Sequence, residues 1–305
     1  MQSQNRFPNQ ADEDRPIVTD FSQRHFTTAD GITIQFRDYG TARAGRPAVL
    51  CLPGLTRNSR DFAEIAALLA PAHRVICPDT RGRGLSDRDP NWQNYHPGTY
   101  VQDALQLLDH LGLDQVVVIG TSMGGLMAMM MAATVPHRLA GVVLNDVGPV
   151  VAPEGLQRIQ GYVGKTAAVA SWDQAVAQVR AINAPFYPDY ADADWLGMAR
   201  KLYRDGPDGA PTADYDPDIA RGLAEGSAVP PDLWPLFQAL GDIPTLALRG
   251  EMSDILSAET LAEMATRHPS MTAVTVANRG HAPMLDEPDA RDAIVAFLDR
   301  LPAGQ

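Results

Sequence analysis

The sequence predicts an α/β fold in which helices cover both faces of a mostly parallel sheet. Short apolar runs alternate with segments of helical periodicity along most of the 305 residues, as in proteins built from right-handed strand–helix–strand units. A serine between two glycines stands at the junction of one such strand and helix. Residues 148–242 interrupt the alternation, because they contain no apolar strand pattern. These three observations indicate one α/β core with an inserted helical cap.

The first third of the chain supplies the beginning of the sheet. Residues Arg24–Tyr39 carry an Asp-Gly pair between two alternating stretches, which predicts a β-hairpin. The short apolar runs Ala48–Leu52 and Arg74–Cys77 are typical of buried parallel strands. Between them, Asp61–Leu69 places its apolar residues on one helical face, and Ser59 is the expected N-cap.

A clearer helix pattern extends from Thr99 to Leu111. Thr99 and Gln102 can form a capping box at its start, and Gly112 is the expected terminator. Four further strands and a closing helix follow along the chain, at Val116–Ile119, Gly141–Leu144, Thr245–Leu248, Thr272–Val276 and about Asp289–Leu301.

The long insertion has its own composition. It is dense in proline, aspartate and glycine, and three pieces of it are helix-like: Gln157–Gly164, Trp172–Ile182 and Trp195–Tyr203. We therefore expect residues 148–242 to form a helical cap on a core of residues 21–147 and 243–305. The polar residues 1–20 carry no apolar signal-peptide core and are expected to form a mobile arm.

Composition excludes several classes of partner. The net charge of −12 argues against nucleic acid and anionic membranes, and no apolar run approaches the ~20 residues of a spanning helix. The two cysteines, Cys51 and Cys77, lie in apolar runs, which favours buried, reduced thiols and a cytoplasmic location. Neither lies at metal-ligand spacing from another cysteine or histidine. The sequence implies no metal and no organic cofactor.

The most informative motif is Gly120–Gly124, which reads Gly-Thr-Ser-Met-Gly. It follows the β-branched run Val116–Ile119 and precedes a run of helix formers, which is the context of a nucleophile elbow. In so tight a turn only small residues fit beside the serine, whose Oγ is then held above the sheet. Ser122 is therefore the predicted nucleophile, since an ordinary strand-to-helix turn leaves the flanking glycines unexplained.

A serine hydroxyl needs a base and an acid that orients that base. His281 lies just past the last strand and is the predicted base, while Asp254 lies just past Thr245–Leu248 and is the predicted acid. Both would stand at the carboxyl edge of the sheet, in the chain order Ser…Asp…His. Asp146, which follows Gly141–Leu144, is the alternative acid. Asp254 is favoured because it alone follows the strand Thr245–Leu248 in this order, and Asp146 is then expected to have a structural role at the base of the cap.

Attack on a carbonyl creates an oxyanion that two preorganised donors should stabilise. One expected donor is the backbone N–H of Met123, the residue after the nucleophile. The other is the N–H of Leu55, in the loop after Ala48–Leu52, where Gly54 allows close approach of the backbone.

Together these motifs resemble the α/β-hydrolase superfamily. Leu52–Gly54 matches its oxyanion-loop motif, with Pro53 in place of the usual histidine, and Asp79–Ser86 matches its D-x-R-G-x-G-x-S segment. The resemblance covers about Arg24 to Leu301 apart from the cap and is similar in detail to the esterase, enol-lactonase and cofactor-free perhydrolase branch. It implies the α/β-hydrolase fold, with an eight-stranded, mostly parallel sheet, and a serine hydrolase of esters or lactones. Ser122 excludes the dehalogenases and epoxide hydrolases, which use an aspartate at the elbow.

Residues near the oxyanion loop and in the cap should select the substrate. Arg57 and Arg60 follow the loop closely and either bind a substrate carboxylate or remain solvated at the start of a helix; Arg57 is the candidate substrate contact. Five cap aromatics either line an apolar pocket or form the cap's own core: Trp172, Phe186, Tyr187, Trp195 and Tyr203.

Two other functions are compatible with the same residues. The triad could hydrolyse a carbon–carbon bond in a diketone or dienoate product, or the fold could serve as a non-enzymatic ligand receptor. In each case the partner is a small molecule, and both a monomer and a homodimer are compatible with the sequence.

Overall fold

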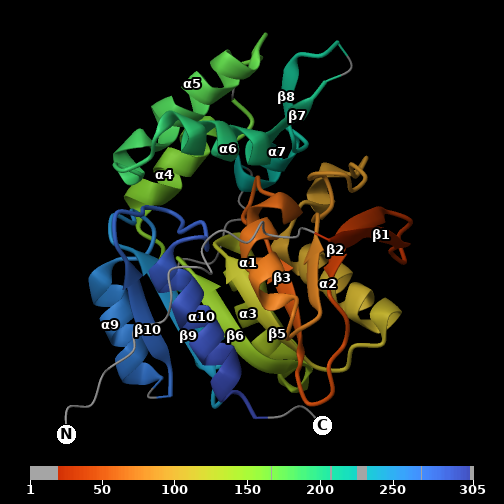
Figure 1. Ribbon diagram of the computed structural model, residues 1–305, viewed down its shortest axis with the longest axis vertical. Helices are drawn as coiled ribbons and strands as arrows, with labels where there is room; N and C mark the ends of the chain where they lie inside the picture. The colour runs from red at the N-terminus through yellow and green to blue at the C-terminus, as the bar shows by residue number, and fades with distance from the viewer. Residues whose placement is uncertain (1–19, 166, 207, 225–231, 269, 303–305) are drawn as a thin grey trace, which may run out of the picture.

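The computed structural model describes residues 20–165, 167–206, 208–224, 232–268 and 270–302, so nearly all of the expected N-terminal arm (1–20) lies outside the described residues. An eight-stranded sheet of order β1-β2-β4-β3-β5-β6-β9-β10 forms the centre of the molecule (Figure 1). Its first two strands form the expected antiparallel hairpin, and β2 also lies antiparallel to β4, whereas the strands from β4 to β10 are parallel. The predicted fold class is therefore confirmed. The strands are β1 (Phe21–Thr27), β2 (Thr33–Tyr39), β3 (Ala48–Leu52), β4 (Val75–Pro78), β5 (Val116–Thr121), β6 (Leu139–Asn145), β9 (Thr245–Gly250) and β10 (Thr272–Val276).

Helices cover both faces of this sheet. Apolar residues of α1 (Ala63–Leu69) and α10 (Pro288–Arg300) pack on one face. Those of α2 (Pro97–Leu111), α3 (Met123–Thr134) and α9 (Ala258–Arg267) pack on the other. The central strands β3 and β5 are buried on both faces because of this arrangement, which explains their unbroken apolar sequences. Short 3-10 helices complete the core at η2 (Ser59–Phe62), η3 (Trp92–Asn94) and η4 (Pro136–Arg138).

Two helix starts differ from the sequence prediction. Asn58 is the N-cap of η2, the 3-10 helix that leads into α1; its side chain accepts a hydrogen bond from the N–H of Arg60, and Ser59 is already inside η2. Helix α2 begins at Pro97, where His96 caps the N–H of Gly98, because proline is well suited to the first turn of a helix. The predicted end of α2 is confirmed, since Gly112 adopts the left-handed conformation with φ of 64°.

The segment between β6 and β9 contains the helices of the expected cap, which Figure 1 shows at the carboxyl end of the parallel strands. It also contains a two-stranded antiparallel ribbon that the sequence analysis did not predict, because strands of three residues carry no periodic signal. Helix α8 packs with α3 in the main core, so the core layer resumes before residue 242. We refer to residues 148–224 as the cap. Its elements are α4 (Pro153–Tyr162), α5 (Trp172–Asn183), η5 (Ala184–Phe186), α6 (Asp192–Leu202), β7 (Tyr203–Asp205), β8 (Pro211–Ala213) and α7 (Ile219–Ala224), and α8 (Trp234–Gln238) follows.

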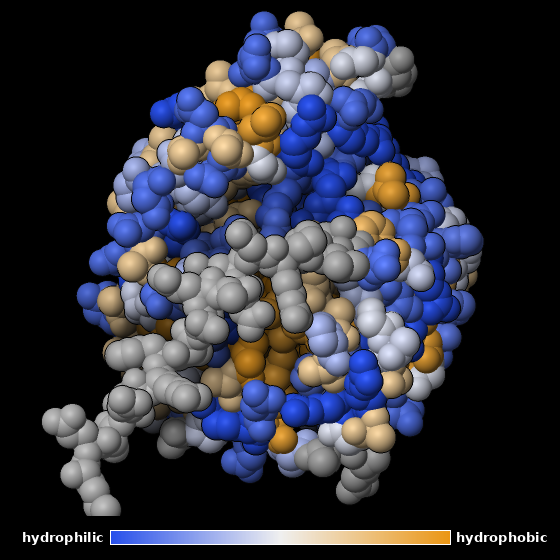
Figure 2. Space-filling model, viewed as in Figure 1, coloured by the Kyte–Doolittle hydropathy of each residue, from blue (hydrophilic) through white to orange (hydrophobic). Residues whose placement is uncertain are grey.

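Polar residues join the cap to the core. The uncovered part of the boundary in Figure 2, above the grey atoms, is mostly hydrophilic, and ion pairs join the two sides. Arg60 pairs with Asp214 at 2.6 Å, and Lys201 pairs with Glu64 at 3.0 Å. Within the described ranges, no helix is long and apolar enough to cross a membrane.

Candidate active site

The serine of the elbow occupies the turn between β5 and α3. Ser122 has φ of 52° and ψ of −113°, a conformation that costs energy and is characteristic of functional turns. A Cβ on Gly124 would overlap the carbonyl oxygen of Leu52, and one on Gly120 would overlap the backbone of Gly124. The two glycines are therefore required by close backbone packing, as the sequence analysis argued from the motif.

Three side chains from three different strand ends meet at this turn. The Oγ of Ser122 lies 2.8 Å from Nε2 of His281, and Nδ1 of the same imidazole lies 2.8 Å from Oδ2 of Asp146. The Asp146 residue is fully buried, and the His281 side chain is 9% exposed. The structure therefore brings together a hydroxyl, an imidazole and a carboxylate in the linear order that serine catalysis requires.

The acid in this arrangement is Asp146, so the prediction that Asp254 orients the histidine is wrong. Asp254 turns away toward the cap and forms a bidentate ion pair with Arg158 of α4, at 2.5 and 2.9 Å. The reason is tertiary: β6 lies beside β9, and the chain leaves β6 with φ of 57° at Asp146. The Asp146 carboxylate then lies over the end of β9 and reaches the His281 loop.

Two residues that the sequence analysis did not select hold the site together. Ser253, next to Asp254, donates a hydrogen bond of 2.6 Å to Asp146. Asn145 donates to the Thr121 hydroxyl at 3.0 Å and to the Pro283 carbonyl at 2.9 Å. The position of Asn145 at the end of an apolar strand is a signal that sequence reasoning could have used, whereas nothing local distinguishes Ser253 from its neighbours.

The loop that carries His281 is bound to the cap on both sides of the histidine. The N–H of Gly280 donates to the Phe186 carbonyl at 2.8 Å, and the Tyr187 hydroxyl donates to the Ala282 carbonyl at 2.7 Å. Next to them, Arg279 pairs with Asp189 at 2.6 Å. Burial raises the pKa of Tyr187, so its phenol remains a proton donor throughout the neutral pH range. The cap segment 186–189 therefore helps to fix the position of the imidazole.

The residues of the two expected oxyanion donors, Leu55 and Met123, both line a cavity at Ser122. Met123 is the first residue of α3, and the first N–H groups of a helix have no intrahelical partner. The buried Arg83 donates to the Leu55 carbonyl at 2.8 Å and thereby braces the loop after β3. Arg83 belongs to the segment 79–86, for which the sequence analysis gave a resemblance but no role.

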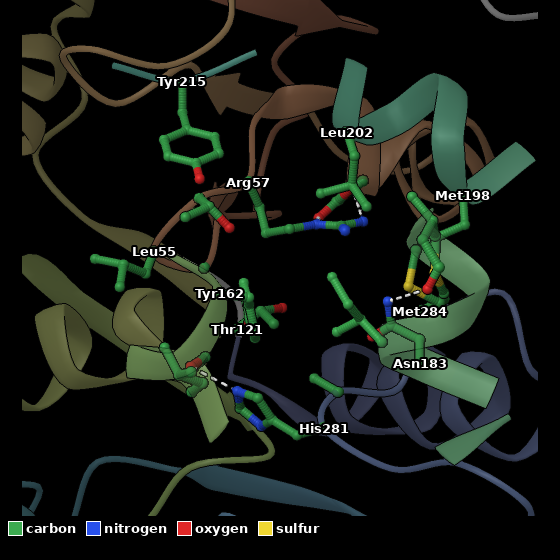
Figure 3. Close-up of a pocket in the computed structure, with 18 of the residues that line it drawn as sticks. Leu55, Arg57, Thr121, Tyr162, Asn183, Met198, Leu202, Tyr215, His281 and Met284 are labelled. Carbon is green, nitrogen blue, oxygen red and sulfur yellow. Dashed lines mark hydrogen bonds and ion pairs between the residues drawn. The ribbon is translucent and has the colours of Figure 1, made fainter. Parts of the chain in front are cut away.

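Two cavities meet at the serine. The first spans about 1100 Å³ including its open mouth, and it lies between the core and the cap (Figure 3). Ser122, His281 and Arg57 line it, together with four tyrosines of the cap: Tyr162, Tyr187, Tyr203 and Tyr215. The second spans about 820 Å³ and is mostly apolar. Ser122, Leu55 and Ile159 line both cavities, so a substrate held at the serine could extend into each.

The two arginines near the oxyanion loop have different positions. Arg57 lines the first cavity and forms a bidentate ion pair with Asp61, at 2.6 and 2.7 Å. Burial lowers the pKa of Arg57, but the neighbouring Asp61 carboxylate outweighs this effect and the net pKa is raised. Arg60 instead binds Asp214 and the Lys201 carbonyl. Neither side chain is a solvated helix-start residue.

The five cap aromatics pack inside the cap, and two of them also line the first cavity. Tyr187 and Tyr203 line the first cavity, and all five belong to the apolar cluster of the cap, with Trp195 almost fully buried. The pocket and cap-core interpretations therefore both hold for the two tyrosines. Cys51 and Cys77 are buried free thiols in β3 and β4. Within the part of the chain that the structure describes, no group of three or more histidine, cysteine or acidic side chains could hold a metal ion.

Comparisons with known proteins agree with this fold. Residues 47–288 match the family model described as alpha/beta hydrolase fold. A curated relative, 3-hydroxybutyrate-oligomer hydrolase from Cupriavidus necator, is 35% identical over 254 residues, which cover 79% of this chain and 85% of the relative. A second, 2-(acetamidomethylene)succinate hydrolase from Mesorhizobium japonicum, is 27% identical and covers 93% and 99% of the two chains. The crystal structure of an alpha/beta hydrolase from Novosphingobium aromaticivorans superposes with a TM-score of 0.88 at 46% identity, covering 92% and 99%.

Proposed function

This chain belongs to the alpha/beta hydrolase fold family, and from that premise we propose that it hydrolyses a small carboxylic ester or lactone through an acyl-serine intermediate. The observation that carries the proposal is the pair of 2.8 Å contacts that link Ser122 to His281 and His281 to Asp146. In this proposal Asp146, not Asp254, is the acid of the triad.

Acylation begins when Oγ of Ser122 attacks the carbonyl carbon of the ester. His281 takes the hydroxyl proton at Nε2, while Asp146 holds the N–H at Nδ1 and stabilises the imidazolium. The N–H groups of Leu55 and Met123 stabilise the oxyanion. When the tetrahedral intermediate collapses, the bond to the alcohol oxygen breaks, and the alcohol leaves with the proton from His281.

Deacylation repeats these steps with water as the nucleophile. His281 takes a proton from the water, whose oxygen attacks the acyl carbon, and the bond to Ser122 Oγ breaks. The serine regains its proton from His281, and the carboxylic acid is released. This sequence needs no redox change and uses only groups that the chain supplies.

The name of the Cupriavidus relative supports an ester as the bond that is cleaved, since oligomers of a hydroxy acid are joined by ester bonds. The apolar second cavity supports a short acyl chain as one part of the substrate.

The proposal is tested with p-nitrophenyl butyrate and with a fluorophosphonate label. We expect the wild-type protein to turn over the ester and to be labelled at Ser122, and Ser122→Ala to do neither, with at least a ~10³-fold loss of kcat. Undiminished turnover by Ser122→Ala would refute the acyl-serine mechanism. A burst of one acyl group per chain with negligible later turnover would instead favour a ligand receptor.

A further inference from the structure

The first cavity contains an ion pair that lies close to the nucleophile. Arg57 and Asp61 line this cavity, and their side chains are 18% and 13% exposed. A Cβ on Gly54 would lie 3.3 Å from Cγ of Arg57 and 3.8 Å from Cβ of Ser122, so the stem of Arg57 passes close to the serine. Figure 3 shows Arg57 and His281 at opposite sides of the cavity. A substrate between them can contact both.

The cavity that contains the Arg57–Asp61 pair lies on the side of the site from which the alcohol part of an ester leaves. His281 must return its proton to the alcohol oxygen, so the alcohol part of an ester lies on the side of the imidazole. Among the described residues, His281 lines the first cavity, whereas the second is lined by Met123 and mostly apolar side chains. The acyl chain therefore fits the second cavity, and the alcohol part fits the first.

The charges of Arg57 and Asp61 cancel, and this argues against a substrate carboxylate beside Arg57. Besides His281, the charged side chains that line the first cavity, as far as the structure describes it, are Arg57 and Asp61. A substrate carboxylate placed beside Arg57 would also face Asp61, and the cavity would then hold an uncompensated negative charge. Burying such an uncompensated charge is strongly unfavourable.

A neutral hydroxyl meets the pair without this cost. Arg57 uses Nε and Nη2 to bind Asp61, which leaves the two N–H groups of Nη1 as donors, and each Asp61 oxygen keeps a further lone pair. A hydroxyl can accept from the guanidinium and donate to the carboxylate at the same time. An alkyl group of the same size can do neither and would leave both charged groups less solvated.

We propose that the Arg57–Asp61 pair selects esters whose alcohol part carries a second, uncharged hydroxyl group. This inference rests on the proposed esterase activity and names the substrate class of the same site: an apolar acyl chain joined to a diol-like alcohol.

Three butyrate esters of similar size test the inference: propyl, 2-hydroxyethyl and carboxymethyl butyrate. Release of butyrate is measured for each, so the acyl group and the deacylation step stay constant and kcat/KM reports the alcohol side. For the wild type we expect kcat/KM to be about tenfold higher for the hydroxyethyl ester than for the propyl ester. The carboxymethyl ester should be at least about tenfold slower than the propyl ester. Equal values for hydroxyethyl and propyl, or a preference for carboxymethyl, would overturn the inference.

Variants of the pair make the test specific. Asp61→Asn leaves Arg57 as an uncompensated cation, so carboxymethyl butyrate should gain about tenfold or more relative to propyl butyrate. The double variant Arg57→Met/Asp61→Leu removes both charges and should abolish the hydroxyethyl preference while propyl butyrate is still cleaved; it also covers the case in which Asp61→Asn does not fold. Unchanged ratios in these variants would overturn the inference.

A matched control variant tests whether the effect is specific to the Arg57–Asp61 pair, and the wild-type rates distinguish failure of this inference from failure of the proposed function. Asp254→Asn breaks an ion pair of the same kind that lines neither cavity, and it should keep the wild-type ratios. If the wild type cleaves none of the three esters, the proposed function fails; if it cleaves propyl butyrate without preferring the hydroxyl, only the present inference fails.

Discussion

At the scale of single residues, Asp146 joins the two loops that form the site. Its Oδ1 accepts from the N–H of Gly250 at 2.8 Å, while its Oδ2 accepts from Ser253 and faces His281. These partners leave the carboxylate one orientation, because one oxygen is held by the last residue of β9 and the other by Ser253 in the loop that follows. A buried carboxylate with fixed donors can hold the imidazole in one tautomer. Asp254, one residue beyond Ser253, has no such contacts and binds the cap.

We therefore expect Asp146 and Asp254 to differ sharply in their effect on catalysis. Asp146→Asn should lower kcat on p-nitrophenyl butyrate by about 10³- to 10⁴-fold, because the amide favours the wrong imidazole tautomer. Asp254→Asn is the matched control and should keep kcat within about threefold, since it removes only a partly exposed ion pair. Steady-state kinetics on both variants decide the point. The reverse ranking would restore Asp254 as the acid.

At the scale of elements, the cap acts on catalysis through the segment 186–189. It binds the backbone at Gly280 and Ala282, on either side of His281, so the position of the base depends on a segment that lies about a hundred residues earlier and outside the core. A Cβ on Gly280 would overlap the ring of Phe186, which shows how closely the two segments pack. The cap therefore both encloses the substrate and supports the imidazole.

The hydroxyl of Tyr187 isolates this effect. Tyr187→Phe keeps the ring in the cap cluster and removes the hydrogen bond to the Ala282 carbonyl. We expect kcat to fall about tenfold with a smaller change in KM, because a loosened imidazole affects the transition state more than ground-state binding.

Tyr190→Phe is the matched control for this prediction. Its ring packs against Tyr187 and Trp195, but its hydroxyl makes no hydrogen bond to another described residue. The ratio of kcat between Tyr190→Phe and Tyr187→Phe should be the same for two esters of different acyl length. Equal kcat values for both variants would show that the cap does not position the base.

At the scale of the whole molecule, a buried charge network ties the hairpin to the core. Arg81 is 1% exposed and pairs with Asp103 of α2, with Asp89, and with Asp30 in the turn between β1 and β2. Three separate segments thus depend on one guanidinium. Asp89 and Asp103 are nearly as buried, so neither can regain water if the arginine is lost.

Arg81→Met should lower the free energy of unfolding by about 3–5 kcal/mol, because it leaves buried carboxylates unpaired. The midpoint and slope of urea denaturation measure the change. Arg24→Met is the control: Arg24 is 42% exposed and its partner Asp38 keeps Arg74, so the loss should stay within about 0.5 kcal/mol. A loss for Arg81→Met no larger than that of the control would contradict the role of the network.

Local patterns in the sequence were enough to predict the sheet, most of the core helices, and the positions of Ser122 and His281. Strand and helix periods are properties of neighbouring residues, and the glycines of the elbow record a local steric demand. The capping residues Asn58 and His96 and the short β7–β8 ribbon were missed because one capping side chain or three strand residues carry little signal.

The identity of the acid was decided only by the tertiary structure. Asp146 and Asp254 both follow strands that end at the same edge of the sheet, and both lie between Ser122 and His281 in the chain. The sequence favoured Asp254 only because of the strand that precedes it. The choice depends on β6 lying beside β9 and on the left-handed turn at Asp146. The same is true of the Arg57–Asp61 pair and of the contact between Tyr187 and the His281 loop. By itself the sequence determined which local structures form and where the nucleophile lies. Which side chains from distant segments come into contact depends on how those structures pack.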